Sequence, residues 1–327
     1  MVHNGIMIFS AGDMDTLDLV VSFDSPTFTH GADKATVEAR PTEFKAELRR
    51  WYRILKALKA AQGKDVNTIR TEEQNLFGGT NNASMRSKVL IRSKGCPKDL
   101  SVKEVFGDRS LVDVFYLAYG IADSAQEFRG AKCLFSWSNH GGNSGDERFW
   151  RLRLTVPSQH RDDVKESLWM LDRFGCIGGR SNSGWGSLSV KLDGANELPK
   201  PDFNGLSQEL DGCLQEGWPH WFGQDGKDLM IWRQSQSSNL YSMYKKFSEL
   251  RRCLNDKGKI ADGKRGATQV HFKVKKSGDV FQAMAYCMPY RHGGKSNLEG
   301  VISSWAKAID EDGNWNRFNP FTEGNFK

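Results

Sequence analysis

The sequence predicts an α+β fold, because strand-like and helix-like patterns follow one another in both halves of the chain. Residues 16–23 alternate apolar and polar side chains, which is typical of a strand with one buried face. Residues 40–59 instead repeat apolar side chains every three or four positions, which is the period of an amphipathic helix. The order strand, helix, strand, strand, helix, strand corresponds to the split βαβ, or ferredoxin-like, pattern.

The remaining elements are predicted from the same two periods. A loop rich in turn residues, 24–34, separates the first strand from the first helix. The glycine-rich stretch within residues 171–192 lies between a helix that leads into it and a strand that leaves it. The other predicted elements are a basic strand through Val89 and Ile91, a strand at 149–156, a helix at 160–174, a strand at 188–192, a strand near 228–233, a helix near 238–254, and strands at 268–274 and 280–286.

Glycine and proline concentrate between Leu192 and Gly217, and this composition predicts a domain boundary. A chain of 327 residues is long enough for two domains of ordinary size. We therefore expect an N-terminal domain of residues 1–195 and a C-terminal domain of residues 196–327.

Composition limits the class of protein. Hydrophobic residues make up 38% and charged residues 26%, no apolar run reaches the length of a membrane span, and the N-terminus lacks the pattern of a signal peptide. Six widely separated cysteines predict reduced thiols, hence a cytoplasmic protein, without a zinc site, a metal or a cofactor. The net charge of +6 is compatible with a polyanionic partner.

Five glycines fall within residues 175–186. Glycine accepts positive φ and lets a backbone approach another chain closely, and successive N–H groups can hold phosphate oxygens. Nucleotide-cofactor motifs run strand, glycines, helix, whereas here a helix comes first, so we do not expect a nucleotide cofactor.

Side chains in the same stretch are of types that bind RNA phosphates and bases. Arg180 can bind phosphate, and Trp185, which lies between two glycines, is expected to be exposed and to stack on a base. The alternative is a tight turn without a ligand. The predicted RNA contacts here are Gly178, Gly179, Arg180, Ser181, Asn182, Ser183, Gly184, Trp185 and Gly186.

The first helix carries a basic stripe formed by Lys45, Arg49 and Arg53. Residues 40–59 hold seven basic side chains and two acidic ones, an excess that favours phosphate contact over an ordinary solvated face. We expect this stripe and the glycine-rich stretch to form a single cleft for a ribose-phosphate chain.

Residues 174–187 read Phe-Gly-x-Ile-Gly-Gly-Arg-Ser-x-x-Gly-x-Gly-Ser, which resembles the signature loop of the RAMP superfamily, the RNA-binding proteins of CRISPR effector complexes. Pro41, Lys45, Leu48 and Arg49 match the start of the first helix in that family. Residues 50–53 and 73–80 are similar to subunit one of the Cmr, or type III-B, complex in particular.

The resemblance implies two tandem ferredoxin-like, RRM-like domains. It also implies a non-catalytic subunit that binds the backbone of crRNA and target RNA near the crRNA 3′ end, together with other Cmr subunits, in antiviral defence. Guide–target pairing would then read the sequence. The chain has no DNA-specific motif.

Two alternatives stay open. One is a RAMP endoribonuclease, for which the catalytic candidates are Asp33 and His30. Some family members cut RNA with a loop aspartate near the place of Asp33 and a metal ion, although the residues around Asp33 do not match theirs. The other is a structural subunit whose basic patches meet acidic protein partners.

Overall fold

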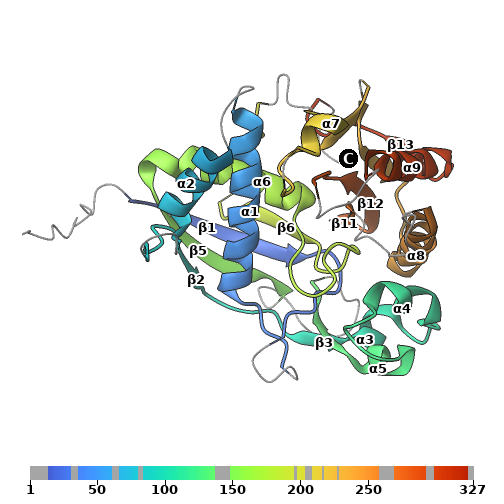
Figure 1. The fold of residues 1–327 in the computed structure, drawn as a ribbon. Helices are drawn as coiled ribbons and strands as arrows, with labels where there is room; N and C mark the ends of the chain where they lie inside the picture. The colour runs from blue at the N-terminus through green and yellow to red at the C-terminus, as the bar shows by residue number, and fades with distance from the viewer. Residues whose placement is uncertain are drawn as a thin grey trace, which may run out of the picture.

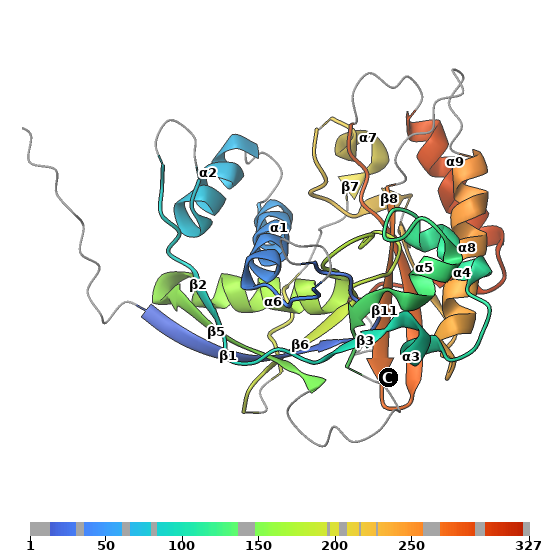
Figure 2. The same ribbon diagram turned by 90° about the horizontal axis from the view of Figure 1, so that it is seen from below.

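The first of two four-stranded sheets has the order β2-β5-β1-β6, and all its strand pairs are antiparallel. Val21 of β1 lies opposite Trp150 of β5 and Val190 of β6, and all three side chains are buried. The alternation predicted for β1 thus gives a row of buried side chains that crosses the sheet. Two helices, α1 and α6, cover the same face (Figures 1 and 2). The bounds are β1 Met14–Phe23, α1 Pro41–Lys59, β2 Leu90–Ser93, β5 Trp150–Pro157, α6 Arg161–Phe174 and β6 Leu188–Leu192.

The second sheet has the order β11-β12-β10-β13 and is also antiparallel. In both sheets the first strand of the unit lies between the third and the fourth, and the second strand is at the edge. Because the order of elements is also the same, the two units share one connectivity. The bounds are β10 Ile231–Gln234, α8 Leu240–Lys257, β11 Val270–Ser277, β12 Val280–Cys287, α9 Leu298–Glu311 and β13 Trp315–Arg317.

A group of short elements is inserted between β2 and β5, where the sequence pattern was ambiguous. In this insertion α4 packs against α8 of the second unit (Figure 1). The insertion comprises β3 Asp99–Ser101, α3 Val102–Phe106, α4 Val112–Ala118, α5 Ala125–Gly130 and β4 Lys132–Leu134. The other short elements are α2 Val66–Phe77, η3 Ser158–His160, β7 Gln208–Glu209, α7 Leu210–Cys213, β8 Gly223–Asp225 and β9 Asp228–Leu229.

The hydrophobic cores draw on both halves of the chain. The core under the first sheet also contains Phe222 and Tyr286, whereas the core of the second unit also contains Phe28, Phe128 and Trp185. The division at residue 195 therefore stays a prediction, because segments from either side of it pack together.

The computed structural model of the protein describes residues 14–30, 36–60, 66–79, 84–136, 148–194, 197–202, 208–215, 217–226, 228–257, 269–291 and 298–322. None of the helices in these ranges is long and apolar enough to span a bilayer. The α+β prediction is confirmed, and the helix expected over 40–59 begins at Pro41, which is a favourable first helical residue. The sequence patterns did not predict α9 and β13.

Candidate nucleic-acid interface

The glycine-rich stretch forms a compact turn against the loop that follows β1. Gly179 N–H donates to Phe28 O at 2.8 Å, and Gly186 N–H donates to Pro26 O at 3.0 Å. A Cβ atom at Gly186 would lie 1.7 Å from Ile177 O, and its φ is +72°. Glycine is therefore required at 186 because another part of the protein backbone approaches it closely.

The turn has two parts with different exposure. Residues 178–183, here called the cap, include the exposed residues Gly179, Arg180 and Asn182. Residues 184–187, here called the base, are all buried. Of the RNA contacts predicted in this stretch, only those in the cap are therefore open to solvent. Gly184, Trp185 and Gly186 are buried, so the expectation that Trp185 is exposed is wrong.

Trp185 is a core residue. Its ring is fully buried and stacks on Tyr244, with ring centroids 3.9 Å apart and planes 14° apart. Phe28 and Phe128 pack edge-on against the same ring, and the indole Nε1–H donates to Leu117 O at 3.1 Å. The flanking glycines do not leave the ring exposed, because α4 and α8, which are distant in sequence, cover it.

The base joins the turn to the second unit. Tyr244 Oη–H donates to Gly184 O at 2.8 Å, and Val274 N–H donates to Ser187 Oγ at 2.9 Å. Immediately before the base, Phe272 N–H donates to Asn182 O at 3.1 Å. These bonds reach α8 and β11, so the turn is a structural connection between the two sheets.

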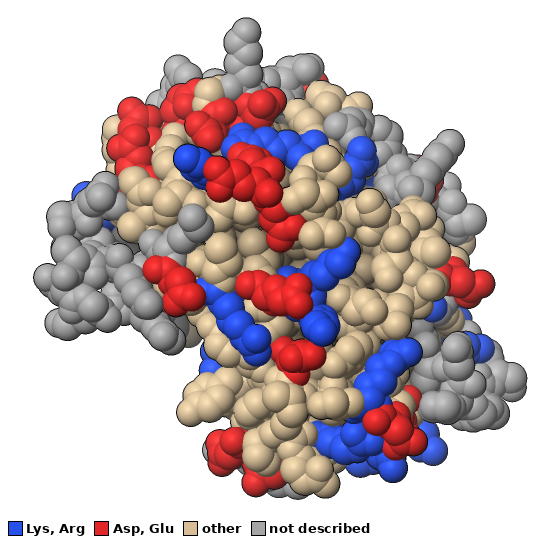
Figure 3. Space-filling view, turned by 90° about the vertical axis from the view of Figure 1, so that its right-hand side faces the viewer, with Lys and Arg blue, Asp and Glu red and all other residues tan. Residues whose placement is uncertain are grey.

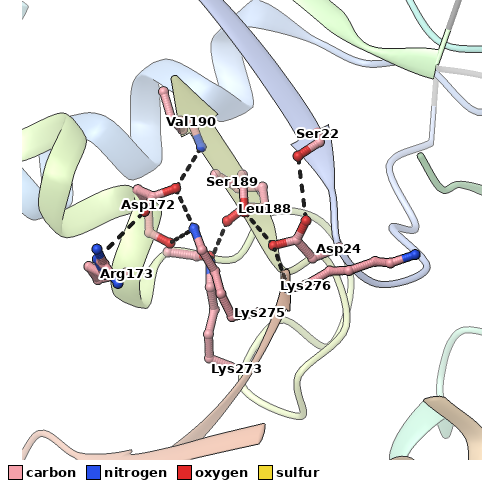
Figure 4. Close-up of polar contacts among 11 residues, drawn as sticks. Ser22, Asp24, Asp172, Arg173, Leu188, Ser189, Val190, Lys273, Lys275 and Lys276 are labelled. Carbon is pink, nitrogen blue, oxygen red and sulfur yellow. Dashed lines mark hydrogen bonds and ion pairs between the residues drawn. The ribbon is translucent and has the colours of Figure 1, made fainter. Parts of the chain in front are cut away.

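Lys273 of β11 extends this connection into a buried polar network (Figure 4). Its ammonium group is fully buried and donates to Gly175 O at 2.5 Å and to Leu188 O at 2.6 Å, one carbonyl on each side of the turn. Burial lowers the pKa of Lys273, and it raises the pKa of the nearby Asp24 carboxyl. The short distances and complete burial indicate a fixed junction.

A second carboxylate in the network is paired. Asp172 Oδ1 accepts from Lys275 Nζ at 2.5 Å and from Val190 N–H at 2.8 Å (Figure 4). Burial alone would raise the pKa of Asp172, but the charge and hydrogen bond of Lys275 outweigh it, so the net shift is downward. The end of α6 is thereby bound to β6 and β11.

The cap presents Arg180 in a left-handed conformation, with φ of 56°. Arg180 is exposed, and among the described residues it forms no ion pair with a carboxylate. The neighbouring Asn182 accepts from Arg251 Nη2 at its carbonyl, 2.6 Å away, and its side-chain Oδ1 lies 2.9 Å from His271 Nδ1. The cap therefore combines a solvent-exposed guanidinium with a backbone that hydrogen bonds from α8 and β11 hold in place.

The basic stripe of α1 has protein partners. Arg49 and Arg53 both form ion pairs with Glu73 of α2, whose carboxylate is buried, and the Arg53 pair is 2.7 Å long. Lys45 Nζ donates to Ser87 Oγ at 2.6 Å and to Val89 O at 2.9 Å. Each of the three side chains is thus engaged in holding α2 or the segment before β2 on α1.

The family model of the RAMP superfamily matches residues 21–189, which include the end of β1, all of α1 and α6, and the whole turn. The chain belongs to the RAMP superfamily. No curated protein matches it in sequence. Among solved structures, its fold is similar to that of apo Cmr1 from Pyrococcus furiosus, with a TM-score of 0.54 and 18% identity over 93% of this chain and 98% of that chain.

A second solved structure gives a similar result. It is a chain in the type III-B Cmr-beta structure bound to cognate target RNA and AMPPnP, in the presence of ssDNA, with a TM-score of 0.51 and 11% identity over 91% of this chain and 99% of that chain. At such identities the likeness concerns the fold, and it extends over both units of this RAMP.

In this RAMP, the predicted stripe and the cap contact different parts of the molecule. The partners of Lys45, Arg49 and Arg53 come from α2, from the segment before β2 and from Trp218. Another residue of α1, Arg50, lies toward the turn, since its charge acts on Cys176, His271 and Tyr286. A single cleft for both sets stays a prediction, and Arg50 was not among the predicted contacts.

The structure describes no catalytic arrangement around the two catalytic candidates. His30 is half-buried and pairs its backbone with Val37, and Asp33 lies outside the described residues. Within the described ranges, no three His, Cys, Asp or Glu side chains are grouped to hold a metal ion. The sequence analysis also missed Tyr119 and Arg251 beside the cap, because only tertiary contacts bring the end of α4 and α8 to the turn.

Proposed function

We propose that this RAMP is a non-catalytic, RNA-binding subunit of a type III-B CRISPR ribonucleoprotein, acting with other Cmr subunits in the cytoplasm. It would hold the backbone of crRNA and target RNA near the crRNA 3′ end, while base pairing between guide and target supplies sequence specificity. We further infer that both units are ferredoxin-like domains in tandem, which the shared strand order supports.

The observation that carries the RNA-binding proposal is the exposed cap. A glycine-containing segment presents the Arg180 guanidinium to solvent, and hydrogen bonds from Arg251 and Phe272 to Asn182 O hold its backbone. A guanidinium can bind phosphate in a bidentate way and carries no preference for base identity. The similarity of fold to Cmr1 over nearly the whole chain agrees with the assignment.

The endoribonuclease alternative is less well supported. His30 is half-buried in a backbone pair with Val37, and no general acid or base is described beside it. We therefore propose binding as the function and use cleavage of single-stranded RNA, which the alternative requires, as a check in the same experiment.

The test is a titration of single-stranded RNAs of unrelated sequence at several salt concentrations. We expect Arg180→Ala to weaken binding of all of them to a similar degree and to reduce the slope of log K against log salt by about 0.7, the value for one phosphate contact on a single strand. The matched control is Arg153→Ala, which removes the same charge from an exposed pair with Asp18 on the outer face of the first sheet.

Two outcomes of this titration would contradict RNA binding at the cap, and a third would support the endoribonuclease. Unchanged affinity and slope for Arg180→Ala, or an equal loss for Arg153→Ala, would mean that RNA does not bind at the cap. Site-specific cleavage of the RNA by the wild-type protein, abolished by His30→Ala or Asp33→Ala, would support the endoribonuclease instead.

A further inference from the structure

The end of α4 exposes a large aromatic side chain beside the cap. Tyr119 is 65% exposed, although aromatic residues of this size are mostly buried in folded proteins. Its ring packs edge-on against Phe115, with centroids 6.4 Å apart, and the rest of the ring faces solvent. The ring is thus supported on one side and accessible on the other.

Arg180 lies directly over the residue that follows Tyr119. A Cβ atom built at Gly120 would be 2.8 Å from Arg180 Nη2 and 3.6 Å from Cζ. A Cβ atom at Gly179 would be 3.7 Å from Ile121 Cγ1. The guanidinium therefore lies against the backbone of the residue next to Tyr119, although Arg180 and Tyr119 are about sixty positions apart in the sequence.

Buried contacts fix this arrangement. Trp185 Nε1–H donates to Leu117 O, which binds the last turn of α4 to the base of the glycine-rich turn. Ile121 N–H donates to Ala118 O at 2.8 Å, and Tyr119 forms a bridge with Ala122. The position of Tyr119 is set by the core, and such preorganisation reduces the entropy lost on binding.

Two basic side chains of α8 lie near this pair. Arg251 contacts the cap through Asn182 O, and the Arg252 guanidinium lies 5.1 Å from the centre of the Tyr116 ring on α4. The acidic residue at the start of α4, Asp113, forms an ion pair with Lys245. The wider face that α4, α8 and α9 form mixes both signs of charge (Figure 3), so attraction of an anion is a property of this local site.

We propose that Tyr119 and Arg180 form a binding site for one nucleotide of single-stranded RNA, with the base stacked on the Tyr119 ring and its phosphate on the Arg180 guanidinium. The site rests on the proposed RNA-binding function and assigns the stacking role to Tyr119. Stacking on an aromatic ring tolerates any base, and a neighbouring guanidinium binds any phosphate. A protein surface would be an alternative occupant, and the experiment separates the two.

The experiment measures binding of the full chain to an unstructured RNA that carries one 2-aminopurine, whose fluorescence falls when it stacks. We expect Tyr119→Ala to weaken binding about 5- to 150-fold, to remove the quenching and to leave the salt slope unchanged. Tyr119→Phe should keep both affinity and quenching. Val112→Ala is the matched control, because Val112 is 66% exposed on the same helix and should behave as wild type.

Four results would overturn the site. Normal quenching and affinity in Tyr119→Ala, with wild-type binding intact, would overturn the site alone and leave the proposed function standing. An equal loss on duplex RNA would show that no base stacks there. If Tyr119→Ala loses co-purification with partner subunits while its RNA affinity is unchanged, the site is a protein-docking surface. If the wild-type protein does not bind RNA at all, the proposed function is overturned together with the site.

Discussion

The cap and the base of the glycine-rich turn are adjacent in sequence but belong to different environments. The cap, residues 178–183, includes three exposed residues, Arg180 among them, whereas the base, residues 184–187, is entirely buried. Both parts are bonded to α8 and β11. The difference shows that one glycine-rich stretch can serve two purposes. In the base, Gly186 admits protein backbone and Gly184 admits the Phe247 ring, so glycine content alone does not mark a phosphate site.

The largest effect is expected from Trp185→Ala in the base. Removing a fully buried indole leaves a cavity among Tyr244, Phe28 and Phe128, which should lower the free energy of unfolding by about 3–5 kcal/mol. Urea denaturation measures this loss. A change below about 1 kcal/mol would mean that the ring is not packed as described, and the distinction between base and cap would fail.

A paired glycine substitution compares the two parts directly. Gly186→Ala in the base should cost about 3 kcal/mol, because its Cβ would overlap Ile177 O and its φ is positive. Gly179→Ala in the cap should change stability by less than about 1 kcal/mol, since its Cβ would lie 3.6 Å from Phe28 O, an ordinary contact distance. Thermal or urea unfolding of both variants would contradict the comparison if their stabilities were equal.

His271, directly under the cap, should link stability to pH. Burial, followed by the charges of Arg50 and Arg251, lowers the pKa of this imidazole well below that of the unfolded chain. The unfolded state therefore binds the extra proton, and the folded state loses stability as pH falls through about 6.5. His271→Gln should remove about 1 kcal/mol of this loss between about pH 7.5 and pH 5.5.

The measurement is urea unfolding of both proteins at the two pH values. The other titrating groups are common to both, so their contributions cancel in the difference. A stability difference between wild type and His271→Gln that does not vary with pH would show that the imidazole titrates as it does in the unfolded chain.

The smallest effect on stability is expected from Arg180→Ala in the cap. The side chain is exposed, so its removal should change the free energy of unfolding by no more than about 0.5 kcal/mol. The same variant should weaken RNA binding, whereas the base variants should act through stability. A loss of several kcal/mol for Arg180→Ala would mean that the Arg180 side chain is itself part of the structural connection.

Local periodicity was sufficient to predict most elements of the two four-stranded sheets and of the helices that cover them, but not the short elements between them. The alternation of residues 16–23 and the apolar stripe of residues 40–59 are properties of single segments, and both correspond to observed elements, β1 and α1. The glycine-rich stretch was correctly placed between a helix and a strand, and its resemblance to the RAMP loop is confirmed by the family match.

Tertiary contacts alone decided how these elements are used. Trp185 is buried because Tyr244 lies against it, and Arg49 and Arg53 are paired because Glu73 comes from another helix. In the same way, Tyr119 lies beside Arg180 only because α4 packs against both the turn and α8. A periodic pattern records which side of a segment is apolar, but the identity of the segment that covers it depends on contacts between distant residues, and that information is present only in the folded chain.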